Sequence, residues 1–99
     1  MNQKVSIPSR PIQDFCHRYH VRELSVFGSA VRNDFHGASD IDLLVDFLPE
    51  AQIGYLTLLK MQRELSSILK RRVDLVPKGG LKAKIRKEIL TQAKVIYAA

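Results

Sequence analysis

The chain has 99 residues, of which 45% are hydrophobic and 26% are charged, and its formal net charge is +6. These values are typical of an ordinary globular protein with a modest core, so we expect a single domain over residues 1–99. No apolar run is long enough to cross a bilayer, and no signal-peptide pattern is present. The sequence therefore lacks the typical features of membrane and secreted proteins, and we expect a cytoplasmic location.

The first predicted helix begins at Ser9, which can cap it, and ends near His20. Its apolar residues recur at helical spacing and form one face: Ile12, Phe15, Cys16 and Tyr19. Cys16 is the single cysteine of the chain, so no disulfide can form within it. We expect Cys16 to be a small buried hydrophobe rather than a nucleophile.

Two strands are predicted after this helix. Glu23–Phe27 is rich in β-forming residues, and Gly28-Ser29 interrupts it. Asp40–Phe47 is the second strand, in which Leu43–Val45 is a continuous apolar run. Such a run is typical of a strand that is covered on both faces.

A longer helix is predicted from about Ile53 to Leu69. Its apolar residues largely keep helical spacing, and we expect them to form a core stripe: Leu56, Leu59, Met61, Leu65, Ile68 and Leu69. A third strand, Val73–Val76, ends at Pro77, and a last helix follows from about Leu81. Lys94–Tyr97 is either a short strand or a helix end. This order predicts an α/β (α+β) fold with helices packed on a small mixed β-sheet.

Basic residues are concentrated in the last third of the chain. They are Lys70, Arg71, Arg72, Lys78, Lys82, Lys84, Arg86, Lys87 and Lys94. Such an excess attracts polyphosphate, nucleic acid or an acidic partner, or is simply a soluble surface. No aromatic residue is interleaved among them, so a stacking platform for single-stranded nucleic acid is not expected. Nucleic-acid binding stays open but is not favoured.

Two carboxylates stand at the start of the second predicted strand. Asp40 and Asp42 are two residues apart and should project to one face, with Ile41 on the other. Adjacent carboxylates repel each other unless a proton or cation lies between them, and a hard divalent cation suits such ligands. If the third strand lies beside the second, Asp74 can complete the cluster. Three carboxylates suit two divalent ions about 3.5–4 Å apart, as in phosphoryl transfer.

The Gly28-Ser29 turn adds a second feature, because backbone N–H groups and a hydroxyl at a strand end can hold phosphate oxygens. Each residue also has a purely structural interpretation. Asp40 could be solvated, Asp42 could pair with an arginine, and the glycine-serine turn could be an ordinary tight turn. Asp74 could form a salt bridge with Arg72. The joint occurrence of all these features favours catalysis.

This central stretch resembles the signature of the DNA polymerase β-like nucleotidyltransferase superfamily. It contains Val26-Phe27-Gly28-Ser29, ten further residues, and Asp40-Ile41-Asp42-Leu43. Val73-Asp74-Leu75 is similar to the third-carboxylate strand of that superfamily, and the whole run resembles its minimal nucleotidyltransferase (MNT) group. Asn33 departs from related sequences, which often carry glycine there. We expect little consequence, since asparagine tolerates the same backbone.

The resemblance implies a metal-dependent nucleotidyltransferase that moves AMP from ATP to a hydroxyl acceptor. Asp40, Asp42 and Asp74 would be the catalytic, metal-binding residues, with two Mg²⁺ ions as cofactor. Gly28 and Ser29 would hold the triphosphate. Arg32 is implied as a further phosphate contact, although it could instead pair only with Asp34.

The resemblance also implies a partner. MNT proteins typically accompany a helical HEPN-domain ribonuclease toxin, and this chain would be the antitoxin that transfers AMP to a tyrosine of the toxin. The partner would then supply the acceptor surface, in a homo- or hetero-oligomer. Two alternatives stay open: a non-catalytic antitoxin that occludes its HEPN partner, and a nucleotidyltransferase acting on a small molecule or RNA.

Overall fold

The computed structural model describes residues 8–28, 40–81 and 83–99. Its helices are α1 (Ser9–Arg18), α2 (Tyr55–Leu69) and α3 (Ala83–Gln92). Its strands are β1 (Val21–Phe27), β2 (Ile41–Phe47), β3 (Val73–Pro77) and β4 (Lys94–Ala98), and a short 3-10 turn, η2 (Lys78–Gly80), follows β3. Within these described ranges, no helix is long and apolar enough to span a membrane.

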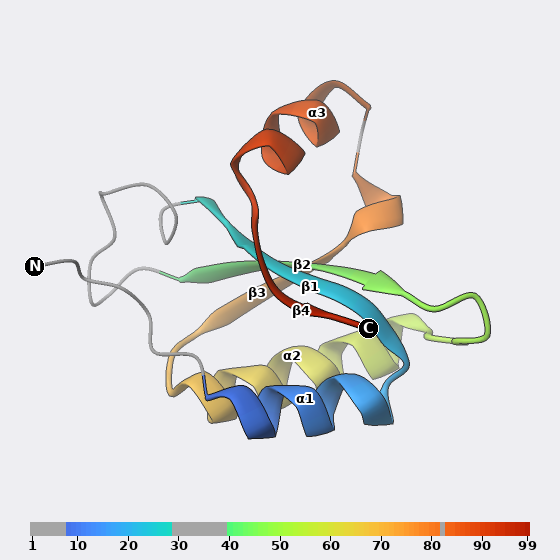
Figure 1. The fold of residues 1–99 in the computed structure, drawn as a ribbon, viewed down its shortest axis with the longest axis vertical. Helices are drawn as coiled ribbons and strands as arrows, with labels where there is room; N and C mark the ends of the chain where they lie inside the picture. Colours follow the sequence, from blue (N-terminus) through green and yellow to red (C-terminus); the bar gives the residue numbers. More distant parts are fainter. Residues whose placement is uncertain (1–7, 29–39, 82) are drawn as a thin grey trace, which may run out of the picture.

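The strands form one sheet in the order β3-β2-β1-β4 (Figure 1). β1 pairs antiparallel with β2 and with β4, whereas β2 pairs parallel with β3. The sheet is therefore mixed, as predicted. A parallel pair needs a crossover connection, and α2 provides it. α1 and α2 lie together below the sheet in Figure 1, and α3 extends above it.

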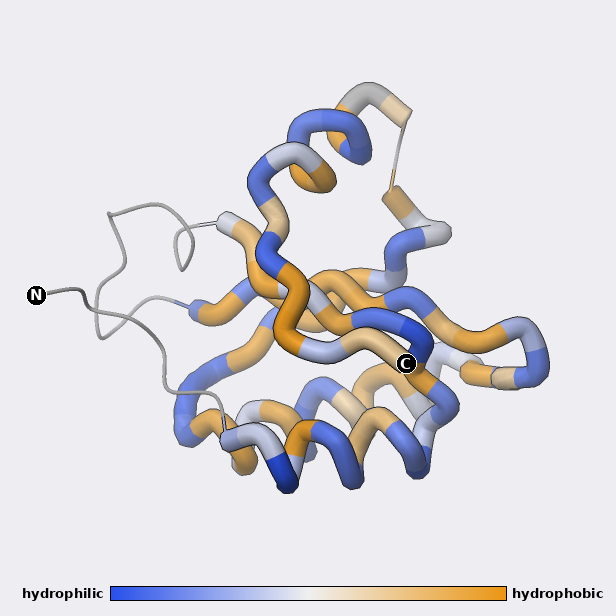
Figure 2. Tube along the Cα trace, viewed as in Figure 1, coloured by the Kyte–Doolittle hydropathy of each residue, from blue (hydrophilic) through white to orange (hydrophobic). Residues whose placement is uncertain are grey.

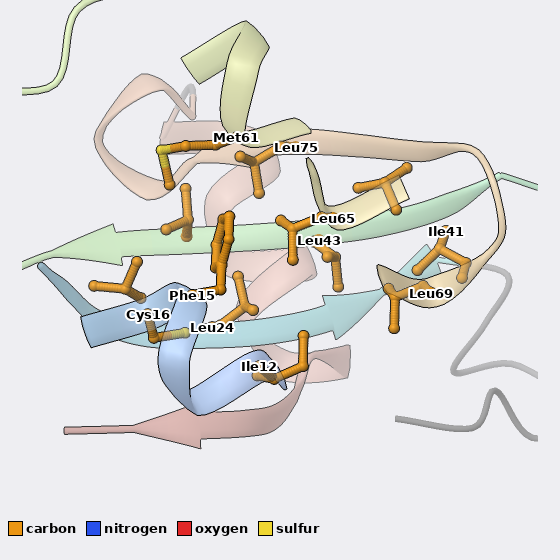
Figure 3. Packing of buried hydrophobic residues seen from close by; sticks show 13 residues of the cluster. Ile12, Phe15, Cys16, Leu24, Ile41, Leu43, Met61, Leu65, Leu69 and Leu75 are labelled. Carbon is orange, nitrogen blue, oxygen red and sulfur yellow. The ribbon is translucent and has the colours of Figure 1, made fainter. Parts of the chain in front are cut away.

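The hydrophobic core lies between the sheet and the pair α1 and α2. It consists of Ile12, Phe15, Cys16, Val21, Leu24, Ile41, Leu43, Val45, Met61, Leu65, Leu69, Val73 and Leu75. Figure 3 shows these side chains converging from both helices and from the strands. In Figure 2, hydrophobic residues run through the strands and alternate with hydrophilic ones along α1 and α2. The alternation places one side of each helix against the sheet.

β2 is the most buried strand, as its apolar run predicts. Alternate residues of β2 enter the core, whereas Leu44 is only 3% exposed although it lies outside that cluster. Both faces of β2 are therefore covered at this point, which confirms the interpretation of the run Leu43–Val45.

The prediction for α2 is wrong at its N-terminal half. Leu56 and Leu59 are 78% and 39% exposed, and Tyr55 beside them is 73% exposed. The buried stripe is instead Met61, Leu65 and Leu69, at a strict spacing of four residues. Apolar residues occur on two sides of the first turns of α2, and helical spacing alone does not tell which side meets the sheet.

The structure corrects one predicted detail at the first helix and decides one open alternative near the C-terminus. The N-cap of α1 is Pro8 and no side-chain capping bond is present, so the prediction that Ser9 caps the helix is wrong. The segment from Lys94 is a strand, β4, whose Tyr97 stands opposite Leu24 of β1. Ile96 and Tyr97 pack against the core. The long-range pairing with β1 decides between strand and helix here.

Cys16 is completely buried, which confirms the sequence interpretation. Burial raises the pKa of the Cys16 thiol to about 12, because the charged thiolate is poorly solvated there. The thiolate is the nucleophilic form of cysteine, so this environment gives no support for a catalytic cysteine.

A polar contact joins the end of α1 to α2. The Tyr19 hydroxyl donates a hydrogen bond to Oε1 of Glu64 over 2.9 Å, and Arg18 donates to Oε2 of the same carboxylate. The bond from Arg18 lowers the pKa of Glu64, and burial followed by the bond to Glu64 raises the pKa of Tyr19. Both shifts favour a charged Glu64 and a neutral Tyr19.

Tyr19→Phe is expected to lower the free energy of unfolding by about 0.5–1.5 kcal/mol at neutral pH, because it removes one partly buried hydrogen bond. Since the folded state lowers the pKa of Glu64, the stabilisation is present above the ordinary value of 4.5 and is lost as the pH falls through the lowered value. Urea denaturation at neutral and acidic pH measures both effects. The control Tyr55→Phe changes an exposed tyrosine and should leave stability unchanged; equal stability of the two variants would contradict this assignment.

Candidate active site

The two carboxylates of β2 and β3 lie side by side. β2 and β3 run parallel with Asp42 opposite Asp74, and neighbouring strands are about 4.7–4.9 Å apart. The hydrophobic residues that flank each aspartate enter the core. Because side chains alternate between faces, Asp42 and Asp74 project from the opposite face, away from α1 and α2. The third strand therefore lies beside the second, as the sequence hypothesis required.

Asp40 immediately precedes β2 and has a different neighbour. Its Oδ1 lies 4.0 Å from Nε of Arg72, the residue that precedes Val73 at the start of β3. The sequence offered Arg72 as a partner for Asp74; the structure pairs it with Asp40 instead. Sequence reasoning missed this contact because it depends on the alignment of two strands.

Gly28 directly follows β1 and lies against the carboxylate of Asp42. Its φ is +74°, in the left-handed region that side chains rarely adopt, and a Cβ placed on it would collide with Oδ2 of Asp42. Phe27, just before it, stands opposite Asp42 in the β1–β2 ladder. The glycine is thus required by its backbone conformation and by the close approach to a carboxylate. Ser29 and Arg32, the other predicted phosphate contacts, lie outside the described residues.

The carboxylates of the site are the side chains that could ligate a divalent cation. Among residues 8–28, 40–81 and 83–99, no group of three or more His, Cys, Asp or Glu side chains is arranged to hold a metal ion. The structure brings Asp42 and Asp74 together and leaves Asp40 with Arg72, so the three-carboxylate cluster stays a prediction. The donor chemistry fits Mg²⁺, which takes carboxylate oxygens together with substrate phosphates. The missing side chain of Gly28 lets the backbone of β1 end directly against the Asp42 carboxylate.

A family model described as nucleotidyltransferase domain matches residues 9–97. The chain belongs to the nucleotidyltransferase domain family. The match extends from the start of α1 into β4, so it includes every element that carries Gly28 and the three aspartates.

The chain is also similar in sequence to a protein adenylyltransferase. Over 80 residues the chain is 42% identical to the protein adenylyltransferase MntA of Thermococcus cleftensis, and the match covers 81% of this chain and 77% of the relative. This nucleotidyltransferase is therefore a homologue of MntA.

Two solved structures share the fold. A toxin–antitoxin complex with AMP-PNP matches with a TM-score of 0.77 at 21% identity, covering 94% of this chain and 75% of that one. A complex of a tri-AMPylated Shewanella oneidensis HEPN toxin with an MNT antitoxin matches with a TM-score of 0.67 at 19% identity, covering 92% and 70%. The shared architecture confirms the fold that the sequence resemblance implied.

The arrangement is suited to one kind of chemistry. Two carboxylates on neighbouring strands concentrate negative charge on the face of the sheet opposite α1 and α2, and Gly28 lies directly against one of them. Catalysis of phosphoryl transfer consists mainly of positioning the phosphate groups and neutralising their charge. Carboxylates that could ligate divalent cations beside a phosphate site are suited to both tasks.

Proposed function

We propose that this nucleotidyltransferase moves AMP from ATP to a tyrosine hydroxyl of a HEPN-domain toxin, with Mg²⁺ as cofactor, and thereby acts as the antitoxin. The observation that carries the proposal is the alignment of Asp42 with Asp74 beside the Gly28 turn. The relatives support the acceptor class. One is named protein adenylyltransferase, and one solved complex holds an AMPylated HEPN toxin with its MNT antitoxin. A cytoplasmic location belongs to the same proposal.

The proposed residue roles follow from position. Asp42 and Asp74, together with Asp40, would hold two divalent cations, which neutralise phosphate charge when bound. Asp74 is exposed and stands at the edge strand β3, where an acceptor hydroxyl can approach. We assign it the task of holding the acceptor proton as the new P–O bond forms and pyrophosphate leaves. Gly28 and Ser29 would hold the triphosphate, with Arg32 as a further contact.

ATP as the donor is supported by the neighbouring structure, which contains AMP-PNP. The Gly28 turn gives a physical reason for a triphosphate at this place. A residue without a side chain lets the backbone approach phosphate oxygens closely, and N–H groups at the end of a strand are free to donate.

The test uses the purified chain, the proposed HEPN partner protein, ATP and Mg²⁺. Intact-mass spectrometry of the HEPN protein should show gains in steps of one AMP, and its ribonuclease activity should fall with the modification. The matched controls omit ATP or replace Asp42 by Asn. Inhibition of the toxin without ATP and without a mass gain would refute transfer and support the alternative of an occluding antitoxin.

A further inference from the structure

Arg72 directly precedes β3, the strand that carries Asp74. The backbone N–H of Ile41 donates to the carbonyl oxygen of Arg72 over 2.9 Å, which aligns the first residues of β2 with those of β3. Arg72 therefore stands two residues before Asp74, just ahead of the row that pairs Ile41 with Val73. Its side chain is 84% exposed, and its Nε lies 4.0 Å from Oδ1 of Asp40.

The contact with Asp40 is weak enough to be exchanged. The side chain of Asp40 is itself 48% exposed, and an ion pair between solvent-exposed groups contributes little to stability. The guanidinium group is a planar fork of donors that matches phosphate oxygens in pairs. Arg72 thus carries the functional group for a phosphate at the edge of the proposed nucleotide site, and a weak ion pair is all that holds it to Asp40.

On the basis of the function proposed above, we propose that Arg72 is a phosphate-binding residue, held by Asp40 in the free enzyme and transferred to the nucleotide phosphates in the loaded one. When Asp40 ligates a divalent cation, its negative charge is taken up and the cation repels the guanidinium group. The nucleotide brings anionic oxygens to the same place. Arg72 then exchanges a carboxylate for a phosphate, and Asp40 is available to the cation.

This exchange predicts opposite effects on two ligands. Arg72→Gln should bind inorganic triphosphate with Mg²⁺ about tenfold more weakly, because a charged hydrogen bond to phosphate is lost. The same variant should bind Mn²⁺ alone as tightly as the wild type or up to about threefold more tightly, because Asp40 no longer has a competing partner. Titration calorimetry with these two probes measures both affinities without any transfer reaction.

The matched control is Arg63→Gln, which removes the same charge from an exposed position on α2. α2 packs on the face of the sheet opposite the carboxylates, so both affinities should equal those of the wild type. A parallel loss of both affinities in Arg72→Gln, or unchanged affinity for triphosphate, would overturn the role of Arg72 alone. Wild-type protein that binds neither Mn²⁺ nor triphosphate would overturn the proposed function as well.

Discussion

Asp42→Asn is expected to lower the rate of AMP transfer by about 10²–10³-fold or more while the fold is retained. The substitution removes one of the two negative charges of the Asp42–Asp74 pair and leaves the shape of the side chain nearly unchanged. A cation ligated there is worth several kcal/mol of charge stabilisation in the transition state, and each 1.36 kcal/mol is a factor of about ten in rate. The rate of AMP incorporation into the HEPN partner measures the effect, and thermal denaturation verifies the fold.

Asp46→Asn is the matched control for this experiment. Asp46 lies on the same strand, and its Oδ2 is 3.9 Å from Nη1 of Arg22, away from the residues assigned to catalysis. A partly exposed pair at this distance contributes little, so both activity and stability should stay close to those of the wild type. If Asp42→Asn transferred AMP at the rate of the Asp46→Asn control, the assignment of Asp42 to the cations would be wrong.

Gly28→Ala is expected to reduce transfer by about 10²-fold and to destabilise the fold by about 1–2 kcal/mol. The destabilisation arises from the left-handed backbone at Gly28, where φ is +74° and a Cβ is unfavourable. The larger effect on activity arises from the contact with Asp42. The added methyl group would collide with Oδ2 of Asp42, and we expect it to push this side chain away from its place beside Asp74. Transfer rates and urea denaturation separate the two effects.

Gly79→Ala provides the comparison. A Cβ at Gly79 meets no atom within 4 Å, and its φ lies outside the left-handed region. This variant should keep both activity and stability. A Gly28→Ala enzyme whose loss of transfer merely follows the unfolded fraction would show that Gly28 has a structural role and no role in holding Asp42.

The candidate site was partly predictable because its strongest signals are local. Side chains alternate along a strand, so the two-residue spacing of Asp40 and Asp42 and the apolar neighbours of Asp74 fix which face each residue takes. The alignment of Asp42 with Asp74 is not local. A slip of two residues between β2 and β3 would keep both carboxylates on the same face and separate them by about 6–7 Å along the strands.

The same distinction explains one wrong prediction and one alternative that the sequence left open. Leu56 and Leu59 have the spacing of a buried stripe but are exposed, whereas Leu58 between them packs against the core, because apolar residues lie on two sides of the first turns of α2 and only one side meets the sheet. The segment from Lys94 to Tyr97 is too short for its own pattern to decide between helix and strand, and pairing with β1 decides it.

The sequence by itself determined the family and the faces that Asp42 and Asp74 take, because each depends on residue identity and on spacing over a few neighbouring positions. The tertiary structure decided which carboxylates meet, that Arg72 pairs with Asp40, and that Gly28 lies against Asp42. These contacts join strands that are tens of residues apart in the chain. Their register depends on the packing of the whole sheet against α1 and α2, and no local pattern encodes it.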